Sequence, residues 1–116
     1  MRLSHDEEVI HYAKEHYKTL DCLADVYTFQ ILWASDNVAK KLGYENHEIE
    51  GLSVRKLLEL SATEFLQIAI TMFDGKPNRK TLLSKNGEKI SALGEVHSFM
   101  LNNTPYVAIS NVVYDK

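Results

Sequence analysis

The sequence predicts an α+β fold in which helices cluster on one face of a mainly antiparallel five-stranded sheet. After an N-terminal helical stretch come two short strand-like stretches, several helical stretches and three further strands joined by tight turns. The 116 residues, 45% hydrophobic and 25% charged, suffice for one core and one domain. The formal net charge of -3 does not indicate binding to nucleic acid or membranes.

The stretch from Leu3 to Leu20 is predicted to form an amphipathic flanking helix, with a capping box made by Ser4 and Glu7. Its apolar residues recur at helical spacing in one narrow stripe, and charged residues fill the other faces. The stripe consists of Val9, Ala13, Tyr17 and Leu20. Such a stripe suits a seam between two copies of the chain or packing on the open face of its own sheet. We therefore divide the chain into a dimerisation helix, 1–20, and a domain, 21–116.

The stretch from Asp21 to Ala34 predicts two short strands, because β-branched and aromatic residues are concentrated in it. Val26, Tyr27 and Phe29 are counted among the strand residues. We place the turn between the strands near 28–30, although no Gly, Pro, Asn or Asp marks it.

Helix starts and stops are explicit in the next stretch. Ser35 or Asp36 can cap a short helix that Gly43 closes, and a second short helix begins at Asn46 and ends at Gly51. Tyr44 is expected to fold back on the first of these helices.

Two more helices are predicted before the last strands. Ser53 can cap a helix over Val54 to Leu60, and Ser61 with Glu64 forms a second capping box. The longer helix that follows is apolar on two sides, which is typical of a helix sunk into a core or covering a sheet. Gly75 and Pro77 are expected to stop it.

The last third predicts three antiparallel strands, 79–84, 88–101 and 106–114. Asn86-Gly87 is typical of a type I′ hairpin turn, which needs positive φ at both central residues. A second turn is expected at 102–105. Several basic residues crowd the first hairpin, and we interpret them as a solvated strand face, with docking of an acidic partner as the alternative. They are Lys76, Arg79, Lys80, Lys85 and Lys89.

This order of elements resembles the PAS sensory domain. The resemblance rests on ILWASDN at 31–37, LGY at 42–44, Glu48-Ile49 with Gly51, the KNGE hairpin at 85–88 and VVYD at 112–115. It covers roughly 20–115, and the helix that usually follows this domain is missing after Asp115. We therefore expect one module of a longer signalling protein.

The resemblance implies a cytoplasmic sensor or dimerisation module of a two-component system, without catalysis of its own. Such a module would form a homodimer and control an output domain of the same polypeptide, such as a kinase, a cyclase or a DNA-binding domain. A ligand-gated sensor and a ligand-free scaffold both fit. The single cysteine, the charged N-terminus and the lack of an apolar run of roughly 20 residues agree with a cytoplasmic setting.

The resemblance also bears on cofactors. Light-sensing relatives carry a flavin-reactive cysteine where this chain has Val54, which excludes a covalent flavin photocycle. Haem-binding relatives place a histidine on the long helix, where 61–75 holds none, and His97 is the only late histidine. We interpret Cys22 as a packing residue. The cofactor, if any, therefore stays unknown.

A metal site is not expected either. His5, His11 and His16 share the first predicted helix at gaps of six and five. A metal pair on one helix face needs a spacing of about three or four.

The family's cavity between sheet and helices suggests where a ligand would bind. Alternation along 88–101 puts small residues on one face of that strand, opposite the long helix. The predicted pocket residues are Trp33, Asn37, Phe65, Ile68, Met72, Ala92, Gly94 and Val96. The alternative is that helix side chains fill this space.

A rival interpretation is a small cone-shaped enzyme of the steroid-isomerase type. It would need a carboxylate or a tyrosine with a shifted pKa inside the apolar cavity. Glu95 and Tyr106 are the nearest candidates, but alternation places Glu95 on the strand face away from Ala92, Gly94 and Val96.

Overall fold

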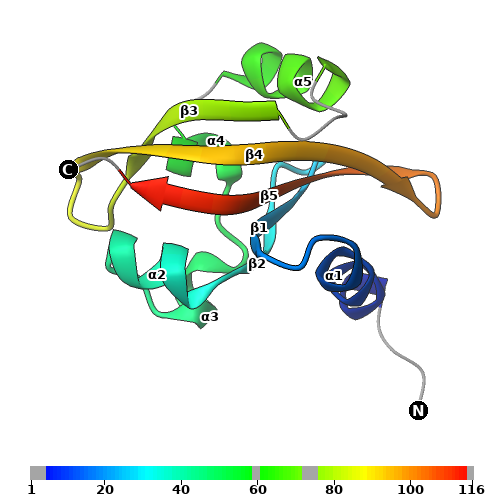
Figure 1. Cartoon of the computed structure of the whole chain (residues 1–116), viewed down its shortest axis with the longest axis horizontal. Coiled ribbons are helices and arrows are strands. Elements are labelled where there is room, and N and C mark those ends of the chain that lie inside the picture. The colour runs from blue at the N-terminus through cyan, green and yellow to red at the C-terminus, as the bar shows by residue number, and fades with distance from the viewer. Residues whose placement is uncertain (1–4, 59–60, 72–75, 115–116) are drawn as a thin grey trace.

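A computed structural model describes residues 5–58, 61–71 and 76–114, and its centre is one antiparallel sheet (Figure 1). The strands follow the order β2-β1-β5-β4-β3, and each pairs with its neighbours in antiparallel register. The strands are β1 (Leu20–Asp25), β2 (Ile31–Ala34), β3 (Lys76–Leu83), β4 (Lys89–Leu101) and β5 (Thr104–Tyr114). The predicted α+β class and five-stranded antiparallel sheet are confirmed.

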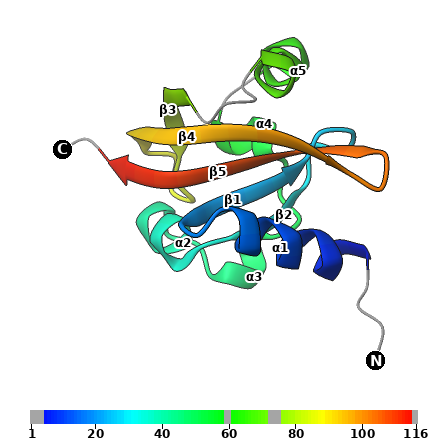
Figure 2. The ribbon, with the colours of Figure 1, turned by 45° about the vertical axis from the view of Figure 1, so that its right-hand side comes forward.

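Helices lie on both faces of this sheet (Figures 1 and 2). Within the described residues, four helices belong to one layer and one helix to the other. Alternation along β1 separates the two layers, because Cys22 and Ala24 join one apolar cluster while Leu23 joins the other. The first layer contains α2 (Asp36–Leu42), α3 (Asn46–Ile49), α4 (Val54–Leu58) and α5 (Ala62–Thr71). The second contains α1 (His5–His16), which Figure 2 shows in front of β1 and β2.

The first helix packs on its own sheet. Val9 and Ala13 are 0% exposed against Leu23, Tyr106 and Ala108. In the single chain these two residues of the stripe are therefore covered, whereas Tyr17 is only partly buried. The seam between two copies stays a prediction.

The bounds of this helix differ from the prediction. It ends at His16, and Leu20 is the first residue of β1, so the predicted helical end at Leu20 is wrong. Apolar periodicity continued across the boundary because the first strand residue is buried in the same cluster as the helix. Ser4, the predicted cap, lies outside the described residues.

The turn between β1 and β2 is marked by Asp25, contrary to our interpretation. Its Oδ1 accepts hydrogen bonds from the backbone N–H groups of Tyr27 (2.7 Å) and Thr28 (3.2 Å), and Phe29 takes a φ of 63°. An aspartate that accepts from the backbone two residues later replaces a backbone turn. Val26, Tyr27 and Phe29 consequently lie outside the strands, and their assignment as strand residues was wrong.

The caps predicted for α2 and for α5 are confirmed. The Ser35 side chain accepts a hydrogen bond from the Val38 N–H, and Gly43 closes α2 with a φ of 81°. Ser61 and Glu64 form a reciprocal capping box, with hydrogen bonds of 3.1 and 3.2 Å. Gly75 and Leu60 lie outside the described residues.

Pro77 does not act as a helix stop but lies within β3. A proline is tolerated there because β3 is an edge strand of the described sheet and pairs with β4 on one side only.

The pair of positive φ values expected at Asn86-Gly87 occurs instead in the β4–β5 hairpin. Positive φ at both central residues occurs at Asn102 (53°) and Asn103 (64°), between the paired residues Leu101 and Thr104. In the β3–β4 hairpin only Gly87 has positive φ, and its N–H donates to the Ser84 carbonyl (3.0 Å). The type I′ prediction for Asn86-Gly87 was wrong, and the pattern is that of a longer loop with one left-handed residue.

Among the residues that the structure describes, no helix is long and apolar enough to cross a membrane.

Candidate functional site

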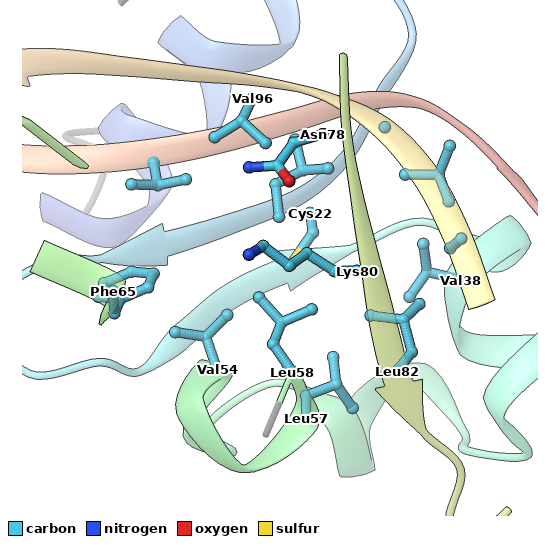
Figure 3. Close-up of a pocket in the computed structure, with 15 residues that line it drawn as sticks. Cys22, Val38, Val54, Leu57, Leu58, Phe65, Asn78, Lys80, Leu82 and Val96 are labelled. Atoms are coloured by element: carbon cyan, nitrogen blue, oxygen red, sulfur yellow. The ribbon is translucent and has the colours of Figure 1, made fainter. Parts of the chain in front are cut away.

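An apolar pocket lies between the sheet and the helices α4 and α5 (Figure 3). Side chains from four strands and three helices surround a cavity of about 50 Å³. Its lining comprises Cys22, Val38, Val54, Leu57, Leu58, Phe65, Asn78, Lys80, Leu82, Ala92, Gly94, Val96, Val107, Ile109 and Val112.

The floor of the pocket exists because β4 presents small residues toward the helices. Ala92, Gly94 and Val96 alternate onto this face. A Cβ atom at Gly94 would lie 3.0 Å from Ile109 Cγ2 and 3.2 Å from Val112 Cγ2. The absence of a side chain at Gly94 therefore lets β5 side chains approach β4 closely.

The helical wall is formed by fully apolar side chains. Val54, Leu57 and Leu58 of α4 are buried, and Phe65 of α5 is buried beside them. The Phe65 ring meets the Phe29 ring edge to face, with 5.5 Å between centroids. This contact connects the wall to the β1–β2 turn.

In the described lining, two polar side chains reach the pocket, both from the edge strand β3. Asn78 and Lys80 share the inward face of β3 with Leu82, which is buried. In the view of Figure 3 the Lys80 side chain lies between those of Asn78 and Leu58.

The sequence interpretation missed Lys80 because it assigned the basic residues of this hairpin to one solvated face. The signal that could have found it is the alternation of Asn78, Lys80 and Leu82, in which an apolar residue marks the inward side.

The structure brings four predicted pocket residues together: Phe65, Ala92, Gly94 and Val96. The backbone of Ile68 belongs to α5, but its side chain and all of Met72 lie outside the described residues. Whether this pocket holds a ligand stays a prediction.

Trp33 and Asn37 do not line the pocket, so their placement there was wrong. Trp33 packs on the opposite face of the sheet, beneath α1, with Lys14 Nζ 4.5 Å from its ring centroid. Alternation along β2 decides this side. The Asn37 amide donates to Asp21 Oδ1 (3.3 Å) and to the Val112 carbonyl (3.1 Å), which directs it toward the sheet end.

Cys22 forms part of the pocket floor as a neutral thiol. Burial raises its pKa to about 12, and the nearby Asp21 carboxylate adds to the increase. The reactive thiolate is therefore scarce at neutral pH, in agreement with a packing role.

The histidines have structural neighbours outside the pocket. His5 Nε2 lies 2.8 Å from the Tyr106 hydroxyl, His11 pairs with Glu15, and His97 Nε2 lies 3.2 Å from Ser110 Oγ. The described part of the chain contains no group of three or more His, Cys, Asp or Glu arranged for a metal ion.

The two residues of the rival enzyme interpretation also lie elsewhere. Glu95 Oε2 accepts a hydrogen bond from the Asn111 amide (2.9 Å). Tyr106 is buried on the α1 side of the sheet, and burial raises the pKa of its hydroxyl. Neither side chain reaches the pocket, so the geometry offers no internal base of that type.

No family model and no curated protein sequence matches the chain. Solved structures do match it. A PAS domain of a Desulfitobacterium hafniense protein is 16% identical with a TM-score of 0.70, covering 87% of this chain and 96% of that one. A PAS domain from a two-component sensor histidine kinase is 10% identical with a TM-score of 0.65, covering 95% and 96%.

A LOV protein of Rhodobacter sphaeroides is similar as well. It is 16% identical with a TM-score of 0.68, and the match covers 97% of this chain and 69% of that one. At these identities the likeness concerns the fold. The order of strands, the helical layer and these matches agree, and the chain has the PAS fold.

Proposed function

We propose that the chain is a regulatory sensor module that binds a small ligand in the pocket and controls an output domain of the same polypeptide. The observation that carries this proposal is the apolar pocket between β4 and the helical wall. Its described lining contains no carboxylate and no histidine, so the site suits binding rather than acid–base catalysis.

The ligand would be neither a covalent flavin nor a large prosthetic group. Val54, which stands where light-sensing relatives carry cysteine, contributes an apolar side chain to the wall. A cavity of about 50 Å³ holds far less than a flavin or haem ring system.

In this proposal residues 21–116 form the sensor and residues 1–20 the flank. The flank would transmit the ligand signal through the sheet, because α1 packs on the face opposite the pocket. One similar structure comes from a sensor histidine kinase, which makes a kinase one candidate for the output domain.

Native mass spectrometry of the freshly purified chain, with an absorbance scan of the same sample, tests the sensor proposal. Extra mass that is released on denaturation would support it. A chain of bare mass that no compound of a small-molecule library stabilises against heat would contradict it.

A second candidate is a ligand-free dimerisation scaffold. The observation in its favour is Val113, which is 58% exposed on β5 and pairs in register with Leu93 of β4. This apolar spot could contact a second copy of the chain.

The same mass spectra report the number of copies. We expect Val113→Glu to convert a dimer into a monomer if this face is the interface, because the exposed side chain makes few contacts within one chain. A bare monomer in the unchanged protein would contradict the scaffold proposal.

A further inference from the structure

We propose that the pocket binds a short aliphatic monocarboxylate, with the tail in the cavity and the carboxylate at Lys80 and Asn78. This inference rests on the proposed sensor function and specifies the class of ligand. It starts from the contrast between an apolar lining and one cation at its edge.

The charge of the ligand follows from Lys80. It is the only charged side chain in the described lining, and it is half-buried on the inward face of β3. A carboxylate whose tail lies in the apolar cavity would meet this ammonium group and accept a charge-assisted hydrogen bond from it. The neighbouring Asn78 amide supplies a second donor for the same anion.

Lys80 is available for this role. None of the carboxylates in the described ranges lies within ion-pair distance of its ammonium group. The positive charge of Lys80 acts on the Glu64 carboxylate. That carboxylate already accepts a hydrogen bond from the Ser61 N–H at the start of α5, and the Glu64 N–H donates to Ser61 Oγ, which completes the capping box. The hydrogen bonds from Ser61 lower the pKa of Glu64 most, and the charge of Lys80 adds a smaller decrease.

The length of the tail follows from the cavity. A water-sized group occupies about 10–15 Å³ of such a volume, so about 50 Å³ accommodates about four groups. A methylene group is close to water in size. An acid of about four to six carbons would therefore fill the cavity while its carboxylate remains at β3.

The lining also argues against a polar tail. Cys22 is a neutral thiol and the remaining floor and wall side chains carry only carbon and hydrogen. A hydroxyl or amine placed among them would find no partner, which disfavours sugars and amino acids.

The alternative is that Lys80 serves the protein alone. An inward-pointing lysine on an edge strand discourages pairing with other chains, and its methylene groups can cover apolar surface while the ammonium remains in water. A lysine with this role would not discriminate among ligands by their charge.

Isothermal titration calorimetry with hexanoate, hexan-1-ol and hexylamine distinguishes these roles. We expect hexanoate to bind most tightly, hexanol more weakly and hexylamine not at all. Lys80→Met should weaken hexanoate binding about tenfold or more and leave hexanol binding unchanged, because only the charged partner is lost. Lys80→Gln serves as a second variant should the methionine variant fold poorly.

Two further variants complete the design. Lys40→Met removes a cation from the exposed side of α2 and should leave hexanoate binding unchanged. Ala92→Val adds two methyl groups to the pocket floor and should weaken hexanoate and hexanol together. Amide NMR spectra verify that each variant is folded.

The outcomes separate this inference from the proposed function. Equal binding of hexanoate by the unchanged protein and by both Lys80 variants would overturn the monocarboxylate assignment, as would tighter binding of hexanol or hexylamine. In either case the pocket would still bind a ligand and the sensor proposal would stand. No binding of any of the three probes would also overturn this inference, and the mass spectra would then decide the sensor proposal by themselves.

Discussion

The carboxylate of Asp21, on the first strand, accepts a hydrogen bond of 2.8 Å from the backbone N–H of Val112, near the end of the last strand. The same carboxylate accepts from the Ser35 hydroxyl (2.6 Å) and from the Asn37 amide (3.3 Å) at the start of α2. Asp21 is only 7% exposed. One buried side chain thus joins β1, α2 and β5 beside the pocket.

We predict that Asp21→Ala lowers the free energy of unfolding by about 2–4 kcal/mol, because it leaves the Val112 N–H and the Ser35 hydroxyl without their acceptor. Chemical denaturation measures the change. Asp36→Ala removes an exposed carboxylate from the first turn of α2 and should cost less than about 1 kcal/mol. Equal losses in the two variants would show that Asp21 does not hold these elements together.

The two hairpins should respond in opposite directions to the same substitution. Asn103→Gly should raise stability by up to about 1 kcal/mol, because Asn103 is held at a φ of 64° and glycine enters that region without strain. Asn86→Gly should lower stability by about 0.5 kcal/mol, because Asn86 has no positive φ and glycine only adds freedom to the unfolded chain. Thermal unfolding of both variants tests this assignment of the turns. A gain in stability from Asn86→Gly without one from Asn103→Gly would contradict it.

The ion pair between Lys85 and Glu48 should make stability depend on acid pH. The hydrogen bond from Lys85 Nζ lowers the pKa of Glu48, and the Glu45 backbone N–H lowers it further. A lowered carboxyl pKa stabilises the fold above the ordinary value of about 4.3, and this stabilisation disappears as the pH falls through the folded-state value.

Lys85→Met should therefore raise the pKa of Glu48 toward its ordinary value in an NMR titration. The difference in Tm between the variant and the unchanged protein should shrink as the pH falls below that range. A Glu48 titration that Lys85→Met leaves unmoved would contradict the pairing.

Cys22 should resist thiol reagents in the folded protein. Burial raises the pKa of its thiol to about 12, and the side chain is buried in the pocket floor. A disulfide reagent at about pH 8 should react slowly with the native chain and at the rate of a free cysteine after unfolding in guanidinium. Equal rates in the two states would mean that the pocket floor opens to solvent.

The raised pKa also has a consequence at alkaline pH. Below the ordinary thiol pKa of about 8.5 the buried neutral thiol makes its full contribution to stability. This contribution is lost as the pH rises through about 12. Cys22→Ala should abolish this part of the alkaline loss of stability.

Much of the local structure could be predicted from the sequence, because its causes lie within a few residues. The Ser35 cap, the left-handed Gly43 and the capping box of Ser61 with Glu64 each depend on hydrogen bonds that close inside one turn. The small residues Ala92 and Gly94 likewise predicted an open strand face, and the structure places the pocket over it.

The predictions that were wrong depend on contacts between segments that lie apart in the chain. Trp33 and Lys80 were assigned to the wrong sides because the inward face of a strand depends on which neighbours it pairs with. Leu20 was assigned to the helix because the first residue of β1 is buried in the same cluster as the apolar residues of α1, so the helical spacing continues past the end of the helix. The left-handed pair at Asn102 and Asn103 follows from the register that sets Leu101 opposite Thr104, which is a property of two strands together.

The sequence by itself thus determined the order of the elements, several of the helix caps and the antiparallel α+β class, because caps, breakers and periodicity act locally. Only the tertiary structure decided that α1 packs on its own sheet, that Asp21 joins the first and last strands, and that Lys80 stands at the pocket edge. The physical reason is that these contacts join residues far apart in the chain, and sheet pairing alone decides which of them share a face.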